Sequence, residues 1–117
     1  MKIAIIGKVN PQLVYEEWVS KLQTKVEVAT VTHINITKGN GILNQYVRKY
    51  AQSRNLIITE YAPDFITYGD EAKTRRNVAL VENSDLVVGF LPESPAKESW
   101  IFRPGISSNN DAKVIIC

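Results

Sequence analysis

The chain has 117 residues, of which 44% are hydrophobic and 22% are charged, and its formal net charge is +2. This length allows one domain with a real core and excludes two, and the composition is ordinary for a globular protein. The basic residues are spread along the chain, unlike the clustered footprint of nucleic-acid-binding proteins, and no apolar run approaches the roughly 20 residues of a membrane span.

The first predicted strand ends on a glycine. After Lys2, residues 3–6 form a short apolar run that ends at Gly7, which is typical of a strand buried on both faces of a parallel sheet. Gly7 allows a tight turn and the close approach of a ligand. Asn10 and Pro11 suit the N-cap and the first position of a helix, which we predict over residues 11–24. Free N–H groups at such a helix start attract anions.

The rest of the chain alternates strands with helices. We predict further strands at 32–37, 56–61, 85–91 and 114–116, helices at 42–51 and 70–83, a loop at 62–69, and an irregular crossover at 92–110 with a short helix near 107–111. This order predicts right-handed crossovers and a mostly parallel five-stranded sheet. The expected fold is α/β, a Rossmann-like three-layer α/β/α sandwich in a single domain, 1–117.

Cysteine and histidine usage argues against two kinds of site. With one histidine and one cysteine in the sequence, we predict no internal disulfide and no metal site. We also expect no cofactor. The apolar run that follows the first two residues is too short for the core of a signal peptide. We therefore expect a cytoplasmic protein with no membrane partner.

The stretch 37–41 is the strongest candidate for a ligand loop. In an open parallel sheet, ligands bind at the carboxyl ends of the strands. Two glycines and an asparagine place several N–H groups in one concavity at a helix N-terminus, and Lys38 adds a positive charge. The loop is neither a P-loop nor the three-glycine dinucleotide fingerprint. An ordinary Asn-Gly turn remains the alternative.

Arg75, Arg76 and Asn77 form the second candidate. A guanidinium binds phosphate or carboxylate with a fork of donors. Because successive helical residues point about 100° apart, at most one arginine faces the sheet edge, and a solvated helix face is the alternative. No nucleophile and base form a pair, so the catalytic residues are unknown, and His33 lies at the strand end away from the ligand edge.

Together these loops define one predicted ligand site at the carboxyl edge of the sheet. Its residues are Gly7, Lys8, Asn10, Thr37, Lys38, Gly39, Asn40, Gly41, Asn44, Arg76 and Asn77.

Several of these stretches resemble one family in order along the chain. The matching stretches are residues 2–7, 36–44, 58–64, 68–69 with 75–77, and 83–90. They resemble the SLOG superfamily, which is related to the LOG and DprA proteins, and within it the short bacterial and phage type. The resemblance implies a Rossmann-like domain that binds a nucleotide or a nucleotide-derived small molecule, as a sensor or sequestering protein. It also implies a homo-oligomer, a dimer, and it favours Arg76, which pairs with Asn77 in the family's motif.

Departures from the family's motifs favour binding over catalysis. Asn44 stands where the family has an aspartate, and the catalytic Pro-Gly-Gly motif of its phosphoribohydrolases is absent. A nucleotide N-glycosidic-bond hydrolase, with Glu93 or Asp64 as its acid, is one alternative. A degenerate module that binds a protein or DNA partner is the other, and nucleic acid is the less expected partner.

Overall fold

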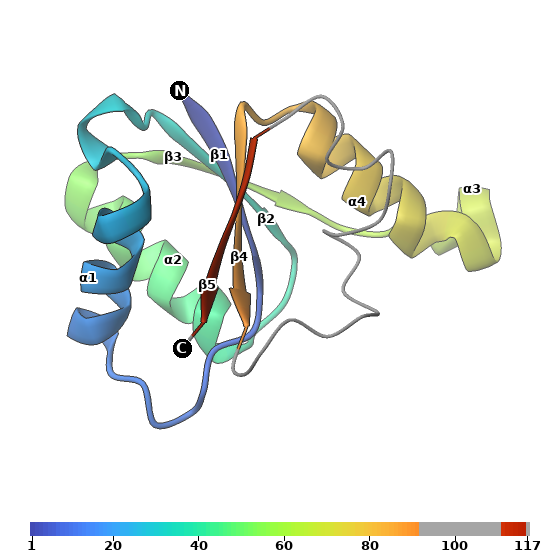
Figure 1. Ribbon diagram of the computed structural model, residues 1–117. Helices are drawn as coiled ribbons and strands as arrows, with labels where there is room; N and C mark the ends of the chain where they lie inside the picture. Colours follow the sequence, from blue (N-terminus) through green and yellow to red (C-terminus); the bar gives the residue numbers. More distant parts are fainter. Residues whose placement is uncertain (92–110, 117) are drawn as a thin grey trace.

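The computed structural model describes residues 1–91 and 111–116 (Figure 1). Strands and helices follow one another in the order β1 (Lys2–Gly7), α1 (Tyr15–Lys25), β2 (His33–Thr37), α2 (Ile42–Arg54), β3 (Ile57–Tyr61), α3 (Phe65–Tyr68), α4 (Ala72–Glu82), β4 (Leu86–Leu91) and β5 (Asp111–Ile116). Two short 3₁₀ turns, η1 (Val28–Thr30) and η2 (Gly69–Glu71), precede β2 and α4. Within this described part of the chain, no helix combines the length and apolar character needed to span a membrane.

The strands form one parallel sheet in the order β3-β2-β1-β4-β5. The predicted α/β class with a parallel sheet is thus confirmed. β1 pairs with β2 only from Lys2 to Ala4, whereas it pairs with β4 from Ile3 to Gly7. The carboxyl end of β1 therefore lies with β4, while the carboxyl end of β2 lies with β3.

Alternate residues of β1 pack against different helices. Ile3 and Ile5 belong to the apolar cluster that includes Trp18 of α1. Ala4 and Ile6 belong to a second cluster with residues of α4. This is the two-residue period of a strand with both faces buried. Figure 1 accordingly shows α1 and α2 on one side of the sheet and α4 on the other.

The first helix begins later than predicted. α1 starts at Tyr15, and its N-cap is Val14, so the predicted N-cap role of Asn10 is wrong. Asn10 instead forms a turn of its own, in which its Oδ1 accepts from the Gln12 N–H at 2.9 Å and its carbonyl accepts from the Leu13 N–H at 2.9 Å. Such local bonds of asparagine compete with helix formation. No helix N-terminus therefore stands directly after β1.

The stretch 62–69, predicted as a loop, contains the single turn α3. Asp64 is its N-cap, because the carboxylate accepts from the Thr67 N–H at 3.1 Å. The helix predicted at 70–83 begins two residues later, at Ala72, because Asp70 lies in η2. β5 begins before the predicted residue 114. The predictions for residues 92–110, including Glu93, lie outside the described residues.

Candidate functional site

Two side chains of α2 hold the loop of residues 37–41. The Asn44 Nδ2 donates to the carbonyls of Thr37, at 2.7 Å, and Gly39, at 3.0 Å. The Arg48 Nη2 donates to the same Gly39 carbonyl and to the Glu60 carboxylate, each at 2.6 Å. These bonds draw the loop's carbonyls toward α2. Asn44, predicted to bind a ligand, uses its NH₂ group to hold its own loop.

The loop also presents backbone N–H groups for which no described residue is an acceptor. Among the described residues, the N–H groups of Gly39, Asn40 and Gly41 have no acceptor, whereas the Lys38 N–H donates to the Tyr61 carbonyl at 2.9 Å. These groups lie directly before α2, whose N-terminus adds partial positive charge. Anion binding by this loop stays a prediction, which these N–H groups permit.

The end of β1 is occupied by the protein itself. Gly7 has a φ of +108°, and a Cβ at this position would lie 2.0 Å from the Phe90 carbonyl oxygen. That same oxygen accepts from the Lys8 N–H at 2.9 Å. The close approach that Gly7 permits is therefore made by β4, and ligand binding at Gly7 stays a prediction. No hydrogen bond between described residues joins Gly7, Lys8 or Asn10 to the rest of the predicted site.

A cavity of about 530 Å³ lies between the end of β3, α3 and α4. Its walls include the ring of Tyr61 and the small side chains of Ala72 and Ala79, which lie two turns apart on one face of α4. Arg76, between them in sequence, also borders the cavity. Arg76 was selected from the sequence, whereas Tyr61, Ala72 and Ala79 were not. The signal that could have shown the cavity was a pair of alanines seven residues apart on a helix.

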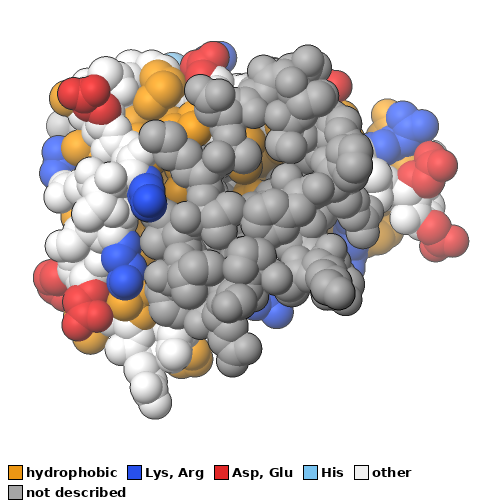
Figure 2. Space-filling view, viewed as in Figure 1, with side chains coloured by type: hydrophobic (Ala, Val, Ile, Leu, Met, Phe, Trp, Pro, Cys, Tyr) orange, Lys and Arg blue, Asp and Glu red, His pale blue; other side chains and the backbone are white. Residues whose placement is uncertain are grey.

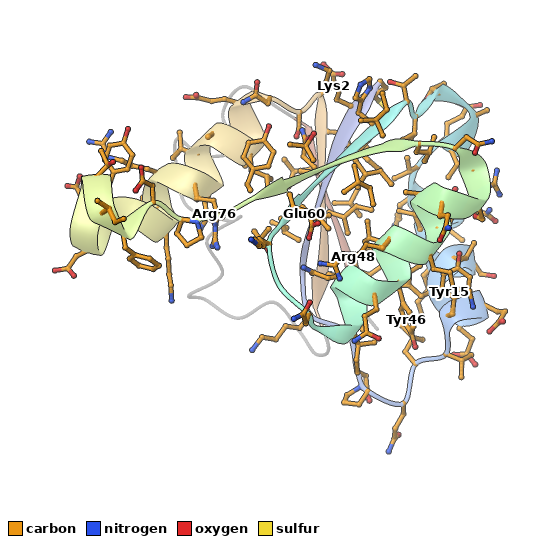
Figure 3. The ribbon with its side chains drawn as sticks, turned by 180° about the vertical axis from the view of Figure 1, so that it is seen from behind. Lys2, Tyr15, Tyr46, Arg48, Glu60 and Arg76 are labelled. Carbon is orange, nitrogen blue, oxygen red and sulfur yellow. The ribbon has the colours of Figure 1, made fainter. Side chains whose placement is uncertain are left out.

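Arg76 is partly buried, and no carboxylate of a described residue forms an ion pair with it. Its Nε and Nη2 donate to the Asn77 Oδ1 at 3.1 and 2.9 Å, and it has no ion pair with any described residue. Burial lowers the pKa of the Arg76 guanidinium, because the charged form loses water. Arg48 and Arg75, by contrast, are paired with Glu60 and Glu71. Figure 3 shows Arg76 on α4, apart from the Arg48–Glu60 pair beside α2.

The predicted residues thus form separate groups, and Tyr61 links two of them. Its carbonyl binds the Lys38 N–H of the loop, and its side chain borders the cavity with Arg76. Asn77 is 91% buried beside Arg76, since only 9% of its surface is exposed. The loop and the Arg76 cavity therefore both adjoin the carboxyl end of β3. Gly7 and Lys8 lie instead at the carboxyl ends of β1 and β4.

The acids and the histidine show no catalytic arrangement. Hydrogen bonds from Thr67 lower the pKa of Asp64, which therefore serves α3 as an ionised cap and is a poor proton donor. His33 Nδ1 lies 2.9 Å from the Thr32 hydroxyl at the start of β2. In the part of the chain that the structure describes, no three His, Cys, Asp or Glu side chains are grouped as metal ligands.

Comparison with known proteins adds no relative. No family model, no curated protein and no solved structure matches this chain.

Proposed function

We propose that this chain is a Rossmann-like three-layer α/β/α domain of the SLOG type that binds a nucleotide or a nucleotide-derived small molecule. The ligand lies at the carboxyl edge of the sheet, beside the Arg76 cavity and the loop of residues 37–41. In this proposal the protein acts in the cytoplasm as a sensor or a sequestering protein. The parallel sheet, with helices against both of its faces, supports the fold part of the proposal.

The state of Arg76 is the observation that carries the proposal. Arg76 is partly buried, and its acceptor among the described residues is a neutral amide, so the charge is desolvated without an anion that compensates for it. A phosphate offers the guanidinium two charge-assisted hydrogen bonds and recovers the cost of that desolvation. The cavity beside Arg76 is therefore suited to an anionic ligand.

The shape and lining of the cavity favour a ligand that also carries a flat ring. Its volume of about 530 Å³ lies within the range of small-molecule sites, roughly 300 to 1,000 Å³. Tyr61 and Ala79, which are both only partly buried, provide apolar surface for a base, and aromatic rings stack favourably. The Lys38 N–H binds the Tyr61 carbonyl, so the loop that follows it begins beside the cavity residue Tyr61, and its N–H groups at residues 39–41, which no described residue accepts, suit a phosphate.

Calorimetric titration with adenine and guanine nucleotides, including cyclic and ribosylated forms, tests the proposal. We expect Arg76→Gln to weaken binding ~10-fold or more, since it removes a charge-assisted contact, and Lys38→Ala to weaken it less. Arg54→Gln is the matched control, because Arg54 lies over the Tyr50 ring at the end of α2, outside the cavity. Absence of heat with every nucleotide, or equal losses in Arg76→Gln and Arg54→Gln, would count against the site.

A further inference from the structure

The loop of residues 37–41 ends in an Asn-Gly pair that is open to solvent. Asn40 and Gly41 are both exposed, and the sequence contains no second Asn-Gly pair. Within the described residues, no hydrogen bond engages the Asn40 side chain, and the Gly41 N–H has no acceptor. Glycine has no Cβ that would hinder the approach of its own nitrogen to the preceding side chain. The Gly41 nitrogen and the Asn40 amide are therefore both available to react with each other.

We propose that Asn40 is a self-modification site, at which the Gly41 nitrogen attacks the Asn40 side chain and converts its amide to a carboxylate. The Gly41 nitrogen gives its proton to hydroxide and forms a bond to the Asn40 Cγ. The bond from Cγ to Nδ2 breaks, and Nδ2 takes a proton from water and leaves as ammonia. Water then opens the resulting succinimide ring at either carbonyl, which gives aspartate or isoaspartate. The net reaction consumes one water and releases one ammonia.

Two features of the loop stabilise the deprotonated nitrogen on which this reaction depends. When Gly41 loses its proton, the negative charge spreads over the peptide group to the Asn40 carbonyl oxygen. This oxygen accepts a hydrogen bond from the Gln45 Nε2 at 3.0 Å, so a donor is already in place where the charge develops. The same peptide group lies directly before α2, where the helix N-terminus adds partial positive charge.

Two other asparagines lack this combination. The Asn83 Nδ2 donates to the Ala79 carbonyl at 2.7 Å, and the N–H of the following residue, Ser84, donates to the Val81 carbonyl at 3.0 Å. Asn10 is followed by a proline, which has no N–H to lose. The structure therefore favours reaction at Asn40 over these two positions.

The modification changes the charge of the loop. Lys38 carries the only charge among residues 37–41, so a carboxylate at position 40 offsets it. Figure 2 shows acidic and basic side chains interspersed over the described part of the visible face, without a broad basic patch there. A new carboxylate beside the N–H groups of residues 39–41 would repel a phosphate. This consequence rests on the proposed function: the capacity of the loop to bind an anion would decline as the protein ages.

Incubation of the purified protein at mildly alkaline pH, followed by mass mapping of its peptides, tests the reaction without a nucleotide. We expect the peptide that contains Asn40 to exchange NH₂ for OH, faster at higher pH and with isoaspartate among the products, while the Asn83 peptide stays unchanged. Gly41→Ala is the matched control: a Cβ there would meet no atom within 4 Å, so the fold is kept while the attack is hindered. Gln45→Leu should slow the reaction ~3-fold.

Two outcomes overturn the modification site. One is an unchanged Asn40 under conditions that deamidate a free peptide of residues 37–43, and the other is an equal rate in wild type and Gly41→Ala. A reaction that is not slowed in Gln45→Leu would contradict the stabilisation by Gln45.

Fixed variants test the consequence for binding. We expect Asn40→Asp to bind the adenine or guanine nucleotides ~5-fold or more weakly than wild type, and Asn40→Gln to bind them like wild type, because it keeps a neutral amide. Equal binding by the two variants would overturn the effect on the ligand. Because mass mapping uses no nucleotide, a failure of the proposed binding function would remove this consequence, and the modification site would still be decided by its own result.

Discussion

Gly7 illustrates how a residue can be correctly singled out and serve a different purpose. Its position after an apolar strand predicts a tight turn and a close approach, and both occur. The group that approaches is the Phe90 carbonyl of β4, because β1 stays paired with β4 to the end of the strand. Asn44 likewise lies in the predicted loop, yet its NH₂ group binds the carbonyls of Thr37 and Gly39.

Gly7→Ala should lower the free energy of unfolding by about 3 kcal/mol, because a positive φ and a steric clash act together. Urea denaturation measures the change. Gly69→Ala is the control: Gly69 also has a positive φ, +54°, but a Cβ there would meet no atom within 4 Å, so we expect a loss of about 1 kcal/mol. Equal losses in the two variants would mean that the contact with Phe90 is unimportant.

At the scale of the element, the alternation of strands and helices could be predicted, and the helix starts could not. β2, α2 and β3 begin within a residue or so of their predicted positions. α1 and α4 start late, because the preceding residues form turns of their own: Asn10 binds the Gln12 N–H, and residues 69–71 form η2.

The cap of α3 should depend on pH. Hydrogen bonds from Thr67 lower the pKa of Asp64 below its usual value. A carboxylate whose pKa is lowered in the folded state stabilises that state above its unfolded pKa, and this contribution is lost as pH falls through the folded pKa. We therefore expect α3 to fray in acid, seen by NMR as a shift of the Thr67 amide that follows the titration of Asp64.

Asp64→Asn provides the control for this titration, because a neutral amide oxygen can cap α3 at every pH. The Thr67 amide shift should then no longer change with pH in the acidic range. An Asp64 titration midpoint at or above the usual value for aspartate would contradict the assignment of the cap.

At the scale of the whole molecule, the larger apolar cluster lies between the sheet and the helices α1 and α2. Trp18 is fully buried in it, with its ring centroid 5.6 Å from that of Phe90 and 5.9 Å from that of Tyr50. These three rings come from α1, β4 and α2. They join the first half of the described chain to β4.

Trp18→Ala should lower the free energy of unfolding by about 3–5 kcal/mol, since it leaves a cavity where three elements meet. Thermal or urea unfolding measures the loss. Val19→Ala is the control on the same helix, because Val19 is only partly buried and we expect a loss of about 1 kcal/mol. A Trp18→Ala variant as stable as Val19→Ala would contradict the central role of this cluster.

The sequence alone determined the α/β class, the parallel sheet and most element positions, because these follow from local periodicity and from continuous apolar runs. It also identified the loop of residues 37–41 and Arg76. Only the tertiary structure decided the strand order, the contact of Gly7 with Phe90, the link through Tyr61 and the cavity beside Arg76. These depend on which residues, distant in sequence, meet across the sheet, and neither spacing nor composition contains that information.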